Sequence, residues 1–552
     1  METPGPAAPQ AARPTPGQPP AGDARWGLPL AVLIVGMFMS VLDVTIVNVA
    51  IPSIQNDLGS TLQDVLWIAT AYTLTLGVVV PLSSWLGDRF GLAPVYLITL
   101  LGFAAGSALC GVAWSLDSLI LFRVIQAVPG GILPVITLTI VYQIVPRERI
   151  GAAMGMYGLG IVFAPAAGPV LGGYLIEHTN WRLIFYINVP IGILGAIAAY
   201  AVLPRSRRGP RRPFDVPGFL SIAFGLFAIL LASSKGEDWG WTSYPVLILA
   251  TAGVLSLALF VVIELAVEHP LLDVRVFRHW PFTNSLLLLS ILTVGLMSML
   301  FYVPVFMQQG QGLTALEAGL RILPQALVVA VMMPIAGRLY DKVGPRWLAA
   351  IGLAVSAYGT YLLCDINPAM TEANIITWTC VRAAGMGLAM MPIMTGGIAS
   401  LPMSKVNQGS AWNNVARQVT GALGLAALSA MATIHQAQLL ANRSALLTTQ
   451  HLAQHGMHPP SGPGDRDFTA MYGLFRRIQL EVLGDSYSNI FLVTSVLTAA
   501  GAFLSLALRS GPTPQTSPAP APAPSPAAAA PPAVATAVAT PQPTPELTTT
   551  GR

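Results

Sequence analysis

The sequence predicts an all-α integral membrane protein of two pseudo-symmetric six-helix bundles with two extra central helices, and three observations lead to this prediction. Only 9% of the 552 residues are charged, 54% are hydrophobic and the mean hydropathy is +0.65, whereas a soluble domain carries about 25% charged residues. Apolar runs of about 20 residues, the length of a transmembrane helix, recur along the chain. A polar segment, S-W-L-G-D-R-F-G at 84–91, is nearly repeated as G-R-L-Y-D-K-V-G at 337–344, which indicates internal duplication.

The apolar runs predict fourteen transmembrane helices, arranged as six, two and six. Asp88 and Asp341, which hold the same place in the two polar segments, are 253 residues apart. Six helices with their loops need only about 180 residues, at about 30 residues each. The surplus therefore fits two extra helices at 217–233 and 244–266. The other twelve runs are at 28–51, 65–83, 94–113, 118–145, 152–175, 183–203, 283–306, 314–337, 347–363, 374–400, 409–433 and 488–508.

The distribution of basic residues predicts the orientation. With the N-terminus inside, 18 Lys and Arg residues fall on the cytoplasmic side and 7 on the outer side, as the positive-inside rule requires. We therefore expect both termini in the cytoplasm and a multi-pass protein of the plasma (inner) membrane. The net charge of +4 reflects this loop bias and does not indicate nucleic-acid binding.

The composition divides the chain into six segments. The two tails are rich in Pro and Ala, cannot build a core and are expected to be disordered. The basic linker either contacts anionic lipid headgroups or simply fixes the topology. A long outer loop, at about 434–487, either docks a periplasmic adaptor, in a host with an outer membrane, or is a plain surface loop. The segments are a cytoplasmic tail (1–27), the N-terminal bundle (28–204), the basic cytoplasmic linker (205–216), the extra helices with their loop (217–279), the C-terminal bundle (280–509) and a second cytoplasmic tail (510–552).

The two polar repeats are expected to be short charged turns that hold neighbouring helices together and gate the protein. Each pairs an Asp with a basic residue and closes on Gly. The residues assigned to these gating loops are Asp88, Arg89, Gly91, Asp341, Lys342 and Gly344.

Four ionisable residues fall well inside the predicted bilayer: Asp43, Arg123, Arg382 and Arg417. Such residues are costly in lipid and therefore mark functional sites by default. Asp43 is the only carboxylate among them, and a low-dielectric site favours its neutral form, so we expect it to bind and release a proton. The alternative is that Asp43 only bonds to backbone or to a permanent Arg partner.

Depth in the membrane indicates a partner for Asp43. Asp43 lies about 13 Å from the outer end of its span and Arg123 about 9 Å from the same side, at 1.5 Å per residue. The hypothesis is that Arg123 holds ionised Asp43 and that protonation loosens the pair. Gln126 and Gly130 share a face with Arg123 at helical spacing, so this face is expected to point to a cavity.

Three further spans carry candidate residues. In the fifth span, Gly168 and Gly172 form a smooth seam and Pro165 and Pro169 introduce a bend, which suits either a rocking helix or simple close packing. Polar residues in the thirteenth span indicate a cavity wall, and a Met stripe in the twelfth is either such a wall or, as we favour, ordinary packing. The full set of expected cavity-lining residues is Asn48, Gln126, Arg382, Met386, Met390, Asn413, Asn414, Arg417 and Gln418, and the expected fifth-span set is Pro165, Gly168, Pro169, Gly172 and Gly173.

Several kinds of site are not expected in this chain. The three cysteines, Cys110, Cys364 and Cys380, lie in apolar runs without metal-ligand spacing. Neither a G-x-x-x-x-G-K-[ST] phosphate loop nor an H-E-x-x-H metal motif is present in the sequence. We therefore expect no enzyme activity, no metal and no cofactor, which leaves a proton gradient as the energy source.

These motifs together resemble the fourteen-helix drug/proton antiporters of the major facilitator superfamily, the EmrB/QacA subfamily. The resemblance covers about residues 28–508. It rests on L-D-V-T-I-V-N-V-A-I-P in the first span, the 84–91 segment, the Arg123/Gln126 pair, the G-P-x-x-G-G run from Gly168, W-R-L-I-F-Y-I-N-V-P-I-G at 181–192 and N-N-V-A-R-Q at 413–418. Ser84 departs from the Gly that is usual in this family. The resemblance implies a major facilitator fold and proton-coupled export of small amphipathic or hydrophobic compounds by alternating access, with Asp43 and Arg123 as the proton-coupling residues.

Two alternatives remain open at this stage. The first is a dedicated exporter of one endogenous metabolite, peptide or lipid precursor. The second is a sensor or scaffold that does not transport, in which the buried charges would be locked pairs. In every case we expect a small-molecule substrate or ligand, a lipid bilayer around the protein and function as a monomer.

Overall fold

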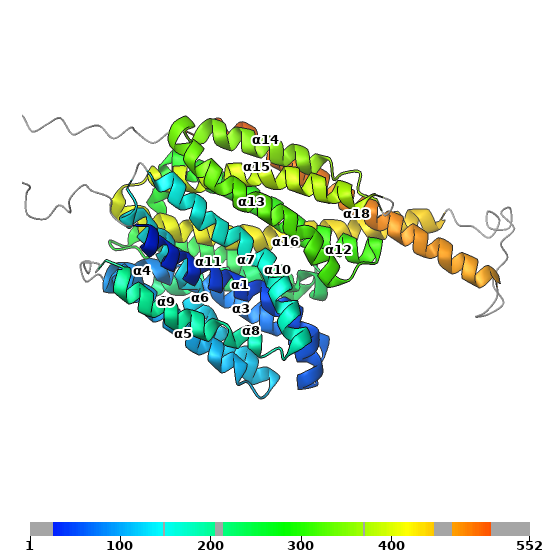
Figure 1. Cartoon of the computed structure of the whole chain (residues 1–552), viewed down its shortest axis with the longest axis horizontal. Helices are drawn as coiled ribbons and strands as arrows, with labels where there is room; N and C mark the ends of the chain where they lie inside the picture. Colours follow the sequence, from blue (N-terminus) through cyan, green and yellow to red (C-terminus); the bar gives the residue numbers. More distant parts are fainter. Residues whose placement is uncertain (1–25, 147–148, 205–212, 368–369, 446–465, 509–552) are drawn as a thin grey trace, which may run out of the picture. The chain divides into compact units, whose positions relative to one another are not determined.

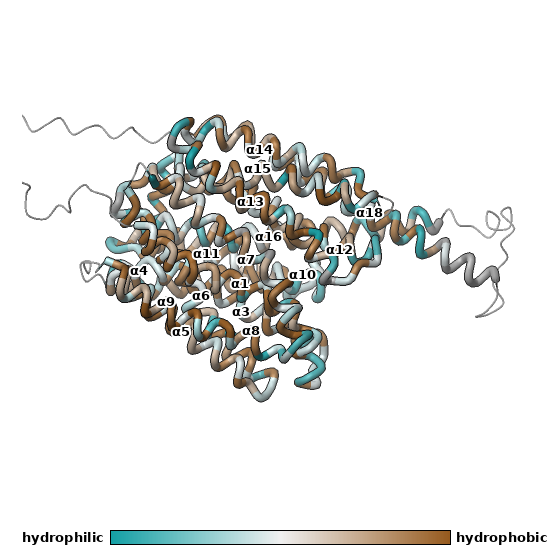
Figure 2. The backbone as a smooth tube through the Cα atoms, viewed as in Figure 1, coloured by the Kyte–Doolittle hydropathy of each residue, from teal (hydrophilic) through white to brown (hydrophobic). Residues whose placement is uncertain are grey.

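The computed structural model describes residues 26–146, 149–204, 213–367, 370–445 and 466–508, which are helical almost throughout and belong to one compact unit (Figure 1). Hydrophobic residues extend along most helices, and hydrophilic stretches lie mainly near helix ends (Figure 2). The predicted tails at 1–25 and 510–552, the linker residues 205–212 and the centre of the predicted outer loop lie outside the described residues.

All fourteen expected apolar runs overlap helices of the structure. The N-terminal part contains α1 (Gly27–Leu58), α2 (Leu62–Val65), α3 (Trp67–Val79), α4 (Leu82–Phe90), α5 (Leu92–Gly111), α6 (Leu116–Ile144), α7 (Ile150–His178), α8 (Leu183–Tyr186) and α9 (Asn188–Val202). The central part contains α10 (Val216–Trp239), α11 (Tyr244–Ala266) and the short η2 (Val274–Arg278). The C-terminal part contains α12 (Trp280–Gln311), α13 (Ala315–Val343), α14 (Pro345–Tyr361), α15 (Glu372–Ala399), η3 (Met403–Lys405), α16 (Val406–Ala445) and α18 (Arg466–Ser505).

Among the described residues, twelve helices or short helix pairs are long and apolar enough to cross a membrane, or thirteen if the bent α7 is one span. The two halves of α7 meet at 42°. Pro165 and Pro169 lie inside this helix and each removes a backbone hydrogen bond, so the bend predicted from these prolines is confirmed. The remaining expected span is α14, which has 17 residues, somewhat fewer than the roughly 20 that cross a bilayer.

The helix pairing of the N-terminal part recurs in the C-terminal part, as expected for a duplicated chain. In the first, α1 packs on α7, α3 on α6, and α5 on both α6 and α9. In the second, α12 packs on α16, α13 on α15, and α14 on both α15 and α18. The fourth main helix of each part, α6 and α15, is thus surrounded by equivalent neighbours. This places Arg123 and Arg382 at comparable positions.

The two parts meet along two seams that differ. On one seam, α7 of the first part packs directly and extensively against α13 of the second. The equivalent pair on the other seam, α3 and α16, has only a slight contact, because α10 packs against both of them. The first of the two extra helices is therefore inserted between the bundles, and α11 packs against its other side.

The two polar repeats are not turns, which corrects the sequence-based expectation. Ser84 to Phe90 lie in α4, and the second repeat forms the last two turns of α13. Only the closing glycines leave the helix, Gly91 with φ 88° and Gly344 with φ 82°. These backbone angles suit Gly because it has no Cβ, so each helix continues to the Gly and the chain reverses there.

The predicted outer loop is also largely wrong. α16 continues to Ala445 and α18 already begins at Arg466, so both sides of the 434–487 segment are helical. Their polar residues form ion pairs on the helix surfaces, such as Arg443 with Glu481. The sequence predicted a loop because the C-terminal turns of α16 and the N-terminal turns of α18 carry too many charges for a membrane span. These charges do not prevent either helix from extending beyond the bilayer.

Candidate functional site

Asp43 lies in the middle of α1 with its side chain 0% exposed. Its Oδ2 accepts a hydrogen bond from Arg123 Nη1 of α6, and the two side chains form an ion pair. Its Oδ1 accepts from Gln126 Nε2 at 3.0 Å and from Asn188 Nδ2 of α9 at 3.2 Å. The pairing predicted from depth in the membrane is thus present, and Asp43 is a buried carboxylate with three donors.

Ser107 of α5 lies behind the carboxylate and fixes the two amides. Its Oγ accepts from Gln126 Nε2 at 3.1 Å and from Asn188 Nδ2 at 3.0 Å, and donates to the carbonyl of Phe185 at 2.9 Å. With one donor and two acceptor positions, this hydroxyl is fully used. The network orients both amide N–H groups toward Asp43.

Sequence reasoning missed Asn188 and Ser107. Asn188 stands alone in the apolar stretch I-N-V-P-I-G, and an isolated amide in a membrane span is a signal that could have indicated it. Ser107 gives no such signal, because serine is common in transmembrane helices and can bond to its own backbone.

Arg123 is held between the carboxylate and two aromatic rings. Its side chain is 1% exposed, its Nη1 also donates to Gln126 Oε1 at 2.9 Å, and its guanidinium lies 3.7 Å from the ring centre of Tyr72 and 5.7 Å from that of Phe185. Cation–π contact and the ion pair together offset the cost of burying this charge. The Nε atom has no hydrogen-bond partner among the described residues.

This arrangement can respond to a proton. Ionised Asp43 accepts from a guanidinium and two amides, whereas a protonated carboxyl group must donate one bond and no longer attracts the Arg123 cation. Removing one partner from a buried ion pair is costly. Loss of this ion pair would therefore weaken the contact between α1 and α6.

A cavity of about 330 Å³ lies next to this network. Arg123 and Tyr72 form part of its wall, together with Asn48 of α1, so Asn48 lies where it was expected. The wall also includes groups from α10, α12 and α16. Its lining residues are Val44, Asn48, Ala69, Thr70, Tyr72, Thr73, Leu74, Arg123, Leu230, Ser233, Ser234, Glu237, Trp241, Phe301, Ala422, Leu425, Ala426 and Ser429.

Arg382 in the C-terminal bundle has different surroundings. It is buried, its Nη2 donates to the carbonyl of Gly295 at 2.6 Å, and no ion pair to it is found among the described residues. With Pro165 and Met386 it lines a separate cavity of about 70 Å³. Met390 and Met394 are buried in the main hydrophobic core, so the Met stripe is mainly packing, as we favoured. Met390 does not line the 330 Å³ cavity.

The four α16 residues expected at a cavity wall, Asn413, Asn414, Arg417 and Gln418, do not line the 330 Å³ cavity. Arg417 donates to Asn414 Oδ1 at 2.9 Å, and Asn414 donates to the carbonyl of Ser410 at 3.0 Å. Asn413 is buried, and its amide atoms have no hydrogen-bond partner among the described residues. The cavity instead takes residues from Ala422 onward, beyond Gln418, because this helix is long enough to pass both regions.

The seam glycines of α7 pack against α1 beside Asp43. A Cβ on Gly168 would lie 2.2 Å from Thr45 Oγ1 and 3.0 Å from the backbone N of Ile46, and one on Gly172 would lie 3.0 Å from Ile46 Cγ1. Around Gly173, no other atom lies within 4 Å of this position. The predicted close approach therefore holds for Gly168 and Gly172 and not for Gly173.

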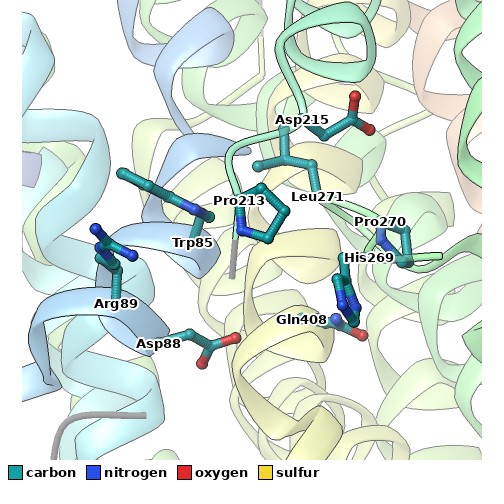
Figure 3. A pocket seen from close by; sticks show the side chains of 9 residues that line it. All are labelled: Trp85, Asp88, Arg89, Pro213, Asp215, His269, Pro270, Leu271 and Gln408. Carbon is teal, nitrogen blue, oxygen red and sulfur yellow. The ribbon is translucent and has the colours of Figure 1, made fainter. Parts of the chain in front are cut away.

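The α4 repeat lies at a tightly closed junction (Figure 3). Asn407 at the start of α16 donates to the carbonyl of Ser84 at 2.8 Å and to Asp88 Oδ1 at 3.0 Å. The adjacent cavity, where the Asp88 carboxylate points toward Gln408, holds only about 20 Å³. Of the second repeat, Lys342 is exposed, and the side chain of Asp341 lies outside the described residues.

An ion pair strengthens this junction. Lys405 Nζ lies 2.9 Å from Asp273 Oδ2, which ties the loop after α11 to the segment before α16. Burial alone would raise the pKa of Asp273, but the bond from Lys405 and the N–H of Arg275 outweigh it and hold this pKa below its ordinary value. Asp273 is therefore ionised at neutral pH.

Comparison with known proteins gives consistent matches over most of the chain. The profile described as Major Facilitator Superfamily matches residues 33–425. The uncharacterized MFS-type transporter YhcA of Bacillus subtilis (strain 168) is 34% identical over 490 residues, which are 87% of this chain and 92% of that protein. The multidrug resistance protein B homolog of Mycobacterium tuberculosis (strain H37Rv) is 31% identical, over 85% of this chain and 87% of that protein. The solved structure of the proton:xylose symporter XylE with bound 6-bromo-6-deoxy-D-glucose aligns with a TM-score of 0.56, covering 88% of this chain and 96% of that one. At 13% identity this last likeness shows the fold alone.

Proposed function

The chain belongs to the Major Facilitator Superfamily, in its multidrug-efflux branch, and from this premise we propose that it exports small amphipathic or hydrophobic compounds in exchange for protons. A member of this family is a multi-pass plasma-membrane transporter and not an enzyme. The relatives' names place drug efflux among their activities; proton coupling is inferred from the residues of this chain.

The observation that carries the proposal is the Asp43 network. A fully buried carboxylate, paired with one arginine and two amides at the wall of a cavity, can hold a proton in one state and the arginine in the other. In the proposed cycle, proton binding at Asp43 releases Arg123. The change in its position then alters the cavity wall and favours the opposite orientation of the bundles.

Alternating access is supported by the unequal ends of the molecule. The α4 junction is closed by Asn407 and by the Lys405–Asp273 pair, whereas the 330 Å³ cavity lies on the other side of Arg123. We infer that the α4 side is cytoplasmic and closes against α16 in this conformation. The residues Asp88 and Arg89 then belong to the gate, as do Lys342 and Gly344 at the equivalent place.

We also propose the full fourteen-span topology with both termini in the cytoplasm. In this topology α14 is the one crossing that helix length alone does not support. We assign it as a span because it packs against α15 and α18, and both of these are long and apolar enough to cross the membrane. The bundles then comprise residues 28–204 and 280–509, and α10 and α11 lie between them in sequence. The protein is proposed to work as a monomer; an adaptor remains an option for hosts with an outer membrane.

The test combines a susceptibility panel with transport into vesicles. Wild type, Asp43→Asn and Glu177→Gln are expressed in an efflux-deficient host; Glu177 is an exposed carboxylate at the end of α7 and serves as the control. We expect the control to protect the host like wild type and Asp43→Asn to lose both protection and proton-driven transport. Protection against a single compound would favour the dedicated exporter, and full coupling in Asp43→Asn would refute the proposal.

A further inference from the structure

Glu237 lines the 330 Å³ cavity beside Arg123, and this carboxylate was not singled out from the sequence. It lies in the last turn of α10, is exposed, and lines the cavity together with Asn48 and Arg123. Its Oε2 accepts a hydrogen bond of 2.5 Å from Ser429 Oγ of α16. The extra helix, inserted between α3 and α16, thus supplies a charged group to a cavity formed otherwise by the two bundles.

The charge of Glu237 is not neutralised by the lysine nearby. Lys235, two residues earlier, is 7% exposed, and its Nζ pairs with Asp238 at 2.9 Å and lies 5.3 Å from the ring centre of Trp67. Arg123 is paired with Asp43.

The remaining wall has the composition of a site for an organic cation. Trp241, just after α10, and Phe301 of α12 contribute aromatic rings, and aromatic faces attract cations. The ring of Tyr72 is already stacked against Arg123. One carboxylate with several aromatic groups in a mainly apolar cavity is the usual chemistry for binding a monovalent cation of this kind. A neutral ligand gains only from the apolar and aromatic surface.

We propose that Glu237 is the specificity-determining residue through which the extra helix α10 gives this transporter its affinity for monovalent organic cations. The inference rests on the proposed export function and names its substrate class. The net charge of Asp43, Arg123 and Glu237 depends on Asp43. When Asp43 is ionised, its charge cancels that of Arg123, and Glu237 leaves the cavity with one negative charge. With Asp43 protonated, Arg123 balances Glu237, so a proton at Asp43 opposes binding of the cation.

The test is equilibrium binding to the purified full-length protein in nanodiscs without any gradient. The probes are tetraphenylphosphonium as a monovalent cation and chloramphenicol as a neutral compound. We expect Glu237→Gln to weaken tetraphenylphosphonium binding about three- to fivefold, since the attraction between the probe and a solvent-screened carboxylate is lost. Chloramphenicol affinity should stay within about twofold, because neutral contacts are unchanged.

Two controls separate charge from structure and from coupling. Ser429→Ala removes the hydrogen bond and keeps the carboxylate, so it should retain most of the cation affinity. Equal loss of both probes in Glu237→Gln, or unchanged tetraphenylphosphonium binding, would overturn the inference. Because no gradient is used, the result is independent of proton coupling: failure of the proposed antiport would show as unchanged Asp43→Asn transport, and failure of the inference as unchanged Glu237→Gln binding.

Discussion

The two bundles hold an arginine at the same place and use it differently. Arg123 in α6 pairs with Asp43 and is surrounded by Gln126 and two aromatic rings, whereas Arg382 in α15 donates to the backbone carbonyl of Gly295. The duplicated helix pairing is retained in both bundles, but within the described part of the chain only Arg123 has an acidic partner. Pseudo-symmetry of the fold therefore does not extend to the chemistry, and proton coupling is expected from the N-terminal bundle alone.

The largest expected effect comes from replacing the two arginines in parallel. Arg123→Met leaves Asp43 buried without its cation, which should cost about 3–5 kcal/mol of stability and abolish proton-driven export. Arg382→Met loses a hydrogen bond worth about 1.5–3 kcal/mol, but it also removes a buried charge that has no ion-pair partner in the described part of the chain, so the two terms largely offset each other. Thermal unfolding in nanodiscs and a proton-driven transport assay measure both variants. Equal losses in the two would break the comparison.

A smaller effect is expected at the equivalent glycine seams of the two bundles. A Cβ on Gly168 of α7 would lie 2.2 Å from Thr45 Oγ1 of α1, whereas one on Gly421 of α16 meets Thr293 Cγ2 of α12 at 3.5 Å. Overpacking costs about 1–3 kcal/mol, so Gly168→Ala should destabilise the protein and reduce transport by displacing Asp43. Gly421→Ala should fold and transport like wild type. The same two assays apply, and a tolerated Gly168→Ala would show that α1 and α7 can move apart freely.

The smallest effect concerns the ion pair outside the membrane, which contrasts with the one inside. Because the folded pKa of Asp273 is lowered, the stability it contributes is present above the pKa of the unfolded chain and is lost as pH falls through the folded pKa. Lys405 is 32% exposed, so Asp273→Asn should cost less than about 1 kcal/mol at pH 7. The difference in melting temperature from wild type should shrink as pH falls from 6 toward 3. A difference that grows in acid would contradict this assignment.

The sequence was most informative where a residue was costly in lipid. Asp43 and Arg123 stood out because charges inside apolar runs require a partner, and helical rise alone put them at a common depth. Ser107 could not be found in this way, because one hydroxyl costs little. Glu237 was passed over because it lies at a helix end, where charges are ordinary. Its role depends on α10 being inserted between α3 and α16, a tertiary contact without a local sequence pattern.

Boundaries failed for a related reason. Hydropathy identifies the part of a helix that lies in lipid, so the polar ends of α16 and α18 were read as loop, and the helical repeat in α4 was read as a turn. The coarse order of helices, including the extra pair, followed from length and spacing, which depend only on the thickness of a bilayer.

The closing glycines of the two repeats share one backbone conformation, which constrains the residue type at both positions. Gly91 has φ 88° and ψ 148°, and Gly344 has φ 82° and ψ 173°, a region that is essentially restricted to glycine. A side chain at either position would place a Cβ in this unfavourable backbone region and should destabilise the fold, whatever the protein transports. At these two positions the similarity of the repeats therefore reflects a requirement of backbone geometry and not of transport chemistry.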